Sequence, residues 1–345
     1  MADICHSCDM ASPPVGVTNF GKLALMMRIG LLGASKIAPR AIIQPAAAHP
    51  EAVITVVGAR DPGKAQAFAA EHGIPAAVGS YRELVERDDV DLVYCGLPPS
   101  VHLDTCRAAS AAGKMLLIEK PFAFDAAAAQ AIVAAAEAAG RPALEAYHYR
   151  FHSLFRRAET LVKDGAIGRV VRARGEFEAE IKRAPGELRW MPEMGGGGMM
   201  DLGCYVAHAF RTLLGEGEVL TARSDLIDGV DATLEADLRF GDVPAWLRCS
   251  MLAPRNDWIE LEGTGGTLRM NRFVSPHYGG NLVLTTAKGS SIEEPSGPST
   301  YAAQLDHAVR VFRGQAEPLT GGADAVATMG LIDACRAKGR AGAIG

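Results

Sequence analysis

The sequence lacks an excess of either charge, a long apolar run and a cysteine framework. Its 345 residues contain 35 Lys and Arg against 40 Asp and Glu, a formal net charge of −5. Because the basic residues are scattered, neither a nucleic-acid footprint nor a polybasic membrane patch is indicated. No stretch reaches the roughly 18 apolar residues of a membrane span, and the N-terminus has no secretory signal pattern. We expect a cytoplasmic protein whose partners are small molecules.

The seven cysteines do not form a disulfide framework, because their number is odd and their spacing is irregular in a chain of this length. This usage indicates a reducing compartment. Cys5 and Cys8 form a C-x-x-C pair, but the local sequence offers no two further ligands to complete a zinc site. We therefore expect no metal.

Hydrophobic residues make up 48% of the chain, enough to build two cores. From residue 28 to about 147, short apolar runs alternate with alanine-rich helical segments, a pattern typical of βαβ units and a parallel sheet. The expected strands are 28–33, 52–59, 91–97, 114–119 and 142–147. The expected helices are 36–48, 62–73, 80–88, 101–113 and 126–140.

The pattern changes after residue 150, where alternating strands follow two helices and a glycine run. The expected helices are 153–164, Met199 to Leu214, 299–314 and 321–338. The expected strands are 218–227, 231–240, 244–252, 258–263 and 267–271. We predict an α/β protein, with a Rossmann doubly wound parallel sheet over 27–147 and an α+β domain with a largely antiparallel open sheet over 148–345. Residues 1–26 are an extension, either a tail or an over-called start.

The first βα turn has the features of a dinucleotide-binding fingerprint. Gly30, Gly33 and Ala38 stand at its small-residue positions, and Ser35 replaces the middle glycine. Glycine permits the tight turn, a small residue lets the backbone approach a pyrophosphate, and the helix N-terminus then faces the phosphates. Serine is small and can hydrogen-bond a phosphate oxygen, so binding is retained.

The end of the second strand selects between the two nicotinamide dinucleotides. An acidic residue there binds a ribose 2′-hydroxyl, whereas a basic residue binds a 2′-phosphate. Arg60 follows the strand, and Asp61 is placed to cap the next helix. NADP(H) is therefore favoured over NAD(H); the alternative is that Arg60 is a solvated loop charge.

The run Met115 to Ile118 is apolar at every position, as in a buried strand, and it ends in Glu119-Lys120-Pro121. Ligands of an open parallel sheet bind outside the carboxyl ends of its strands, so Lys120 is delivered to the cofactor edge. Glu119 can hold or orient its ammonium, and Pro121 fixes the backbone with a trans or a cis bond. The alternative is a surface pair between Lys120 and Glu119.

A polar stripe follows the glycine run 195–198. Asp201, Tyr205 and His208 are spaced by four and three residues, which places them on one face of a helix. A polar stripe after a glycine run is typical of a helix that faces a cleft. In the alternative reading, Asp201 is favoured by the helix dipole and Tyr205 is a boundary residue.

Together these motifs resemble the glucose–fructose oxidoreductase/inositol dehydrogenase (Gfo/Idh/MocA) family, with Tyr149-Arg150-Phe151-His152 as a further match. The resemblance covers about residues 27 to 338 and is strongest to the branch of NADP-dependent dihydrodiol and aldose dehydrogenases. It implies a nicotinamide-dependent oxidoreductase acting on a secondary alcohol of a sugar, cyclitol or diol. It also implies a homo-oligomer, a dimer or higher, formed through the open sheet. Tyrosine at 205, where the inositol dehydrogenases carry histidine, argues against that activity.

The resemblance implies that Lys120 and Tyr205 are catalytic, and we add Asp201 to orient substrate hydroxyls or Lys120. A lysine beside Tyr205 would lower its pKa for acid–base work, although the reverse assignment, with Lys120 as proton carrier, stays open. The candidate cofactor residues are Gly30, Gly33, Ser35, Lys36, Ile37, Arg60, Leu97, Pro98, His102, Glu119, Lys120 and Arg150. The candidate substrate residues are Lys120, Trp190, Asp201, Tyr205 and His208.

Two other functions use the same fold. A glycosidase with retained nicotinamide would oxidise its substrate transiently, and a non-catalytic NADP-sensing regulator would need only the cofactor contacts. The presence of both Lys120 and Tyr205 argues against the sensor.

Overall fold

The structure, a computed structural model, describes residues 26–342. Nearly all of the predicted N-terminal extension and the Cys5–Cys8 pair lie outside the described residues. Within the described part of the chain, no helix is long and apolar enough to cross a membrane. No group of three potential metal ligands is found within residues 26–342.

Sheet A is fully parallel, with the strand order β3-β2-β1-β4-β5-β6. This confirms the predicted doubly wound sheet, whose order reverses between β1 and β4 and so leaves a binding crevice at their carboxyl ends. The short edge strand β3 was not predicted. The strands are β1 (Met27–Leu32), β2 (Ala52–Gly58), β3 (Ala76–Val78), β4 (Leu92–Cys95), β5 (Met115–Ile118) and β6 (Ala143–Glu145).

Helices cover both faces of sheet A, and capping side chains define where several of them begin. Asp61 accepts the backbone N–H of Lys64, and Asp125 accepts that of Ala128. One face carries α4 (Tyr81–Val85), α5 (His102–Ala111) and α6 (Ala126–Ala138). The other face carries the π-helical turn η1 (Pro39–Ile43), α2 (Gln44–Ala48), α3 (Pro62–His72) and α9 (Thr300–Phe312).

Sheet B has the order β14-β13-β12-β11-β7-β10-β9-β8 and is antiparallel except for the β7–β10 pair. The predicted largely antiparallel sheet is confirmed, and it also contains β7, β13 and β14, which were not among the expected strands. Its strands are β7 (Val170–Glu178), β8 (Gly217–Ile227), β9 (Val230–Phe240), β10 (Val243–Ser250), β11 (Asn256–Gly263), β12 (Gly266–Asn271), β13 (Asn281–Thr286) and β14 (Gly289–Glu293).

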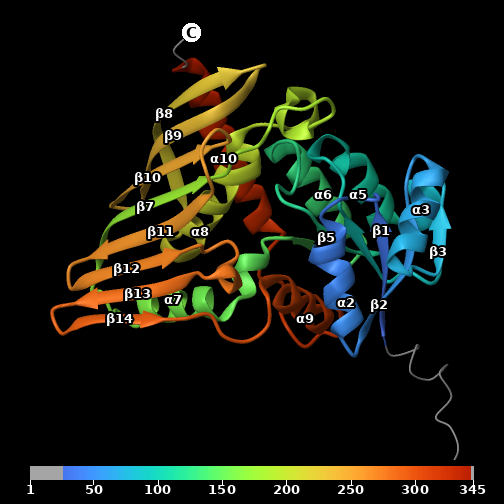
Figure 1. Cartoon of the computed structure of the whole chain (residues 1–345), viewed down its shortest axis with the longest axis horizontal. Helices are drawn as coiled ribbons and strands as arrows, with labels where there is room; N and C mark the ends of the chain where they lie inside the picture. The colour runs from blue at the N-terminus through green and yellow to red at the C-terminus, as the bar shows by residue number, and fades with distance from the viewer. Residues whose placement is uncertain (1–25, 343–345) are drawn as a thin grey trace, which may run out of the picture.

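Helices α8 (Cys204–Leu214) and α10 (Ala323–Ala341) pack on one face of sheet B, and α7 (Ser153–Lys163) lies near β13 (Figure 1). The predicted helix over residues 199–214 divides into the π-helical turn η6 (Met199–Gly203) followed by α8. Helix α9 returns to sheet A, where Leu305 and Val309 join the core around Ile29. The last third of the chain therefore supplies strands to sheet B and a covering helix to sheet A.

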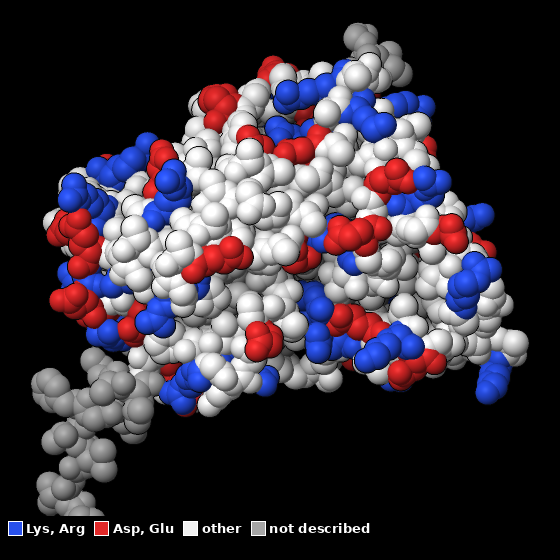
Figure 2. Space-filling view, turned by 180° about the vertical axis from the view of Figure 1, so that it is seen from behind, with Lys and Arg blue, Asp and Glu red and all other residues white. Residues whose placement is uncertain are grey.

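Charged residues of both signs are interspersed over the face drawn in Figure 2. On that face they lie around a broad region of uncharged residues. This distribution fits the composition and gives no electrostatic footprint for nucleic acid on the face shown.

Candidate active site

Lys120 lies at the carboxyl end of β5, as predicted, and the Lys120–Pro121 peptide bond is cis. Its Nζ donates to Asp201 Oδ1 at 2.8 Å and to the Asp201 carbonyl oxygen at 2.7 Å. Glu119 is turned away, and its Oε1 accepts the Tyr94 hydroxyl at 2.6 Å. The ammonium of Lys120 is therefore held by Asp201 of the turn η6 and not by the neighbouring Glu119.

Asp201 joins two cations. Besides Lys120, Arg189 Nη1 lies 3.6 Å from its Oδ2. Burial disfavours the charged forms, but the mutual attraction of the pair outweighs it, so the pKa of Lys120 is raised and that of Asp201 is lowered. The side chains remain 13% and 22% exposed. An ammonium group is therefore present at neutral pH and within reach of a ligand.

The glycine run explains how Asp201 reaches this place. At Gly197 φ is +123°, and a Cβ would lie 2.2 Å from Asp231 Oδ1. Asp231 in turn accepts the Met199 backbone N–H at 2.6 Å, and its burial raises the pKa of its carboxyl to about 6. Only glycine permits this crossing, which brings η6 and its Asp201 against the start of β9.

Tyr205 packs beside Lys120 in a way that sequence reasoning did not foresee. Lys120 Nζ lies 5.0 Å from the centroid of the Tyr205 ring, and the hydroxyl instead pairs with His148 Nε2 at 3.3 Å. Burial raises the pKa of Tyr205 well above its ordinary value, with nearby acidic groups adding to the effect. The expected lowering by Lys120 is therefore wrong for this arrangement, and Tyr205 is a neutral phenol.

His148, Thr300 and Tyr301 complete the site and were missed by the sequence analysis. His148 begins the 3-10 turn η3 (His148–Phe151), directly after β6, so its place at a strand's carboxyl end was the signal that could have found it. Its Nδ1 lies 2.8 Å from Thr300 Oγ1, and its ring packs 4.0 Å from that of Tyr301. Both partners come from α9.

Four predicted site residues, two histidines, an arginine and a tryptophan, make other contacts. His208 is 1% exposed, with Nδ1 on the Tyr149 hydroxyl and Nε2 on Asp324. His102 is fully buried between the carbonyl oxygens of Leu97 and Phe122. The other two are Arg150, which pairs with Glu159, and Trp190, whose indole donates to the Ile181 carbonyl. In this structure, burial or pairing occupies all four side chains.

The first βα turn fits a dinucleotide phosphate. Gly33 has φ +92°, and a Cβ at Gly96 would lie 2.6 Å from Ser35 Oγ. That hydroxyl is buried without a hydrogen-bond partner, so it is available to a phosphate oxygen after a small rotation. Glycine is needed at position 30 for a different reason, because a Cβ there would lie 2.9 Å from the Leu84 side chain. Gly30 therefore serves helix packing.

The remaining predicted cofactor residues line the same edge with different exposure. Lys36 is exposed, Ile37 and Pro98 are half-buried, and Leu97 packs over Gly33. Arg60 is exposed beside Tyr81, and Asp61 caps α3 as predicted. Burial raises the pKa of Tyr81, and Arg60 opposes that rise. An unburied guanidinium thus stands at the end of β2.

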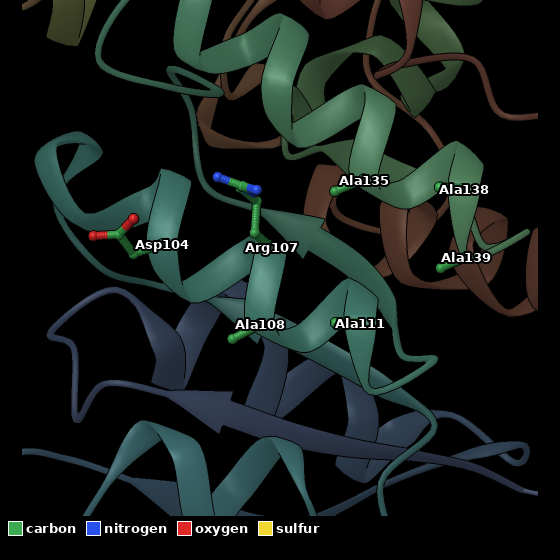
Figure 3. A pocket seen from close by; sticks show the side chains of 7 residues that line it. All are labelled: Asp104, Arg107, Ala108, Ala111, Ala135, Ala138 and Ala139. Atoms are coloured by element: carbon green, nitrogen blue, oxygen red, sulfur yellow. The ribbon is translucent and has the colours of Figure 1, made fainter.

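A separate hollow lies between α5 and α6 (Figure 3). This groove of about 610 Å³ is open and lined mainly by alanine, and neither Lys120 nor Tyr205 borders it. Its lining residues are Asp104, Arg107, Ala108, Ala111, Ala135, Ala138 and Ala139. It is therefore not part of the site at the carboxyl edge.

Two family models match the chain. Residues 27–147 match the oxidoreductase family with an NAD-binding Rossmann fold, and residues 155–269 match the Gfo/Idh/MocA C-terminal domain. The chain belongs to the Gfo/Idh/MocA family. The resemblance drawn from the motifs is confirmed, and this Gfo/Idh/MocA protein is an NAD(P)-dependent oxidoreductase.

Relatives of this Gfo/Idh/MocA protein act on sugars and diols. D-xylose 1-dehydrogenase (NADP(+)) 2 of Haloferax volcanii is 32% identical, covering 92% of this chain and 98% of the relative. Trans-1,2-dihydrobenzene-1,2-diol dehydrogenase of Xenopus laevis is 33% identical over 70% and 73% of the two chains. A 3-ketoreductase from Actinomadura kijaniata, solved with NADP and TDP-benzene, has a TM-score of 0.83, 27% identity and 92% and 98% coverage.

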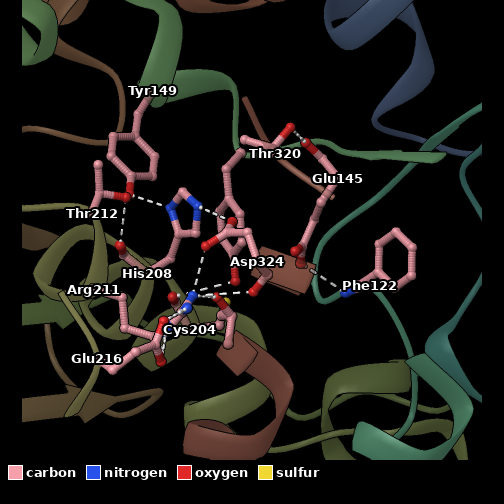
Figure 4. A network of polar contacts seen from close by, with 12 residues as sticks. Phe122, Glu145, Tyr149, Cys204, His208, Arg211, Thr212, Glu216, Thr320 and Asp324 are labelled. Atoms are coloured by element: carbon pink, nitrogen blue, oxygen red, sulfur yellow. Dashed lines mark hydrogen bonds and ion pairs between the residues drawn. The ribbon is translucent and has the colours of Figure 1, made fainter. Parts of the chain in front are cut away.

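Near the site of this Gfo/Idh/MocA protein, a partly buried polar network connects α8 to α10 (Figure 4). Asp324 accepts from Arg211 Nη1 at 2.6 Å and contacts His208 Nε2 at 3.1 Å. Burial alone would raise the pKa of Asp324, but His208 and Arg211 outweigh it and lower the pKa to about 2. The network thus stabilises the ionised carboxylate.

We expect Asp324→Asn to lower the free energy of unfolding by about 1–2 kcal/mol at pH 7. The folded pKa of about 2 lies below the unfolded value of 3.8, so this stability is present above pH 4 and lost as the pH falls through 2. Urea unfolding at pH 7 and pH 3 should show the variant's deficit shrinking. Asp306→Asn, at an exposed pair with His49, is the matched control. An equal deficit at both pH values would assign the loss to packing.

Proposed function

We propose that the chain is an NADP(H)-dependent oxidoreductase that moves a hydride between the nicotinamide and a secondary alcohol or ketone of a sugar, cyclitol or vicinal diol. The observation that carries the proposal is the Lys120 ammonium, held by Asp201 against the Tyr205 ring at the carboxyl edge of a parallel sheet. Hydride exchange is the chemistry that a bound nicotinamide supplies. The protein must then position the substrate and manage one proton and one developing charge.

Lys120 carries the charge in this proposal. Its raised pKa keeps the ammonium protonated, so it hydrogen-bonds the substrate oxygen and stabilises an alkoxide. Tyr205 is a neutral phenol and so acts as the proton donor to that oxygen during reduction. In oxidation the same oxygen of Tyr205 receives the proton. Asp201 positions Lys120 through two contacts, and its own carboxylate stays ionised.

NADP(H) is the proposed cofactor because two chain features fit it. The unpartnered Ser35 hydroxyl lies at the phosphate turn, and the exposed Arg60 lies where a 2′-phosphate would extend. The xylose dehydrogenase and the 3-ketoreductase support the same choice through their NADP dependence and bound NADP. The Rossmann match alone covers either dinucleotide.

A polyhydroxylated substrate is proposed because the site offers charged groups that hydrogen-bond hydroxyls. Asp201 accepts, and Lys120 and Arg189 donate, from three segments of the chain that meet at the site. An aldose-aldose oxidoreductase from Caulobacter crescentus, solved with glycerol, supports this class through its TM-score of 0.85, 26% identity and 92% and 98% coverage.

The test follows nicotinamide absorbance with purified protein against aldoses, cyclitols and vicinal diols. NADP⁺ and NAD⁺ are compared side by side at fixed ionic strength. We expect turnover with at least one member of the panel and a preference for NADP⁺. Tight NADP(H) binding without turnover of any free alcohol would contradict the proposal and favour the retained-cofactor glycosidase or the sensor.

A further inference from the structure

A buried hydrogen-bonded chain connects Tyr205 to the first turn of α9. The Tyr205 hydroxyl lies 3.3 Å from His148 Nε2, and His148 Nδ1 lies 2.8 Å from Thr300 Oγ1. Exposure is 6% for Tyr205, 3% for His148 and nil for Thr300. Within residues 26–342, no other hydrogen bond to the Tyr205 hydroxyl is found. Its proton can therefore go only to His148 or to a ligand.

His148 is a neutral imidazole in this setting. Burial lowers its pKa well below the ordinary value, and the cations that face it reinforce the effect. A neutral ring has one N–H and one bare nitrogen, whereas both flanking hydroxyls can donate or accept. The charged or titratable groups that face it are Lys120, His277, Arg40 and Arg255, and the tilted ring of Tyr301 packs against it.

Two protonation states of His148 match the two directions of the proposed reaction. In the neutral ring with its proton on Nδ1, the bare Nε2 accepts the Tyr205 O–H, so the tyrosine oxygen can accept a proton from an alcohol. In the protonated ring, Nε2 also carries a proton and donates it to the tyrosine oxygen, so the Tyr205 O–H is free for a carbonyl oxygen. Thr300 serves both states because its hydroxyl oxygen accepts from Nδ1 in each.

We propose that His148 is a positioning residue that orients the Tyr205 hydroxyl and relays its proton; this rests on the proposed function. In oxidation the substrate O–H and C–H bonds break. The hydride goes to the bound nicotinamide, the hydroxyl proton to the Tyr205 oxygen, and the former Tyr205 proton to His148 Nε2. After the product leaves, the imidazolium returns this proton through Tyr205 to water that enters the site. Reduction runs the same steps backwards and starts from protonated His148.

Activity assays with the wild type and five variants test the relay. We expect His148→Gln to lower kcat about 10-fold while the KM for NADP⁺ is unchanged. Because His148 acts through Tyr205, the same change should have no further effect in a Tyr205→Phe background. Thr300→Val should lower kcat less. His307→Gln changes a buried histidine of α9 that stacks on Phe151 and is the control for packing. Equal losses in both backgrounds would overturn the relay.

A second readout does not depend on turnover. In ¹⁵N-histidine-labelled protein at pH 7, the His148 ring should be neutral, with Nε2 shifted by Tyr205→Phe and Nδ1 shifted by Thr300→Val. An imidazolium, or nitrogens insensitive to both changes, would contradict the proposal. The two proposals fail differently: wild type without turnover rejects the proposed function and the relay that rests on it. Wild-type turnover that His148→Gln leaves unchanged rejects the relay alone.

Discussion

Lys120→Met is expected to lower kcat about 10³-fold while NADP(H) binding is retained. Methionine has nearly the same length but no charge, so the change removes the group that stabilises an alkoxide in a poorly solvated site. Asp201 keeps a cation within reach, because Arg189 Nη1 lies 3.6 Å from its other oxygen. The fold should therefore survive. Steady-state kinetics give kcat, and quenching of protein fluorescence gives the affinity for NADPH.

Two further variants make the result interpretable. Lys163→Met changes an exposed lysine at the end of α7 and should leave kcat unchanged. Lys120→Arg keeps the charge but cannot give up its proton at any accessible pH. Partial recovery in Lys120→Arg would assign the lysine an electrostatic role, and none would favour Lys120 as the proton carrier. A loss of kcat below 10-fold in Lys120→Met would exclude it from the chemistry.

The meeting of Lys120 and Asp201 could be predicted, because each has a local signature. Lys120 ends an apolar strand, and Asp201 follows a glycine run that lets two segments cross closely. The fold could be predicted for the same reason, since strand and helix periodicity is written in neighbouring residues. Features that depend on neighbouring residues in the sequence could therefore be predicted.

The partners of Tyr205 could not be predicted, because they depend on where α9 packs. Thr300 and Tyr301 lie about 100 residues after Tyr205 and reach the site only because α9 returns to sheet A. The π-helical turn η6 also changes the phase of the helix, which periodicity assumes to be regular. The spacing of residues in the sequence predicts neither the position of α9 nor the π-helical turn.

Residue type alone could not show what the rings of His102 and His208 contact. Both are chemically capable groups near functional strands, yet their ring nitrogens are taken by carbonyl oxygens or by buried side chains. Burial opposes charging of His102, but Cys95 and the two carbonyls outweigh it and raise its pKa. Such histidines hold loops together, and only a structure distinguishes them from His148.

Arg60→Ser is expected to reduce the preference for NADP⁺ over NAD⁺ about 10²-fold. The guanidinium can make charge-assisted hydrogen bonds to a 2′-phosphate, each contributing about 1.5–3 kcal/mol, and 1.4 kcal/mol corresponds to a factor of ten. NAD⁺ has no 2′-phosphate, so its KM should change little. The ratio of kcat/KM for the two dinucleotides is the measurement, made at two salt concentrations because the interaction is ionic.

The nearby Arg82 provides the control for this argument. Arg82 follows Tyr81, the residue that lies beside Arg60, and its side chain is exposed. It is already paired with Glu86, one helical turn away. Arg82→Ser should therefore leave the ratio unchanged, although it removes the same charge from the same end of the sheet. If both variants changed the ratio equally, the preference would come from the general field. If neither did, Arg60 would be the solvated loop charge of the alternative reading, and the 2′-phosphate would be held by another residue.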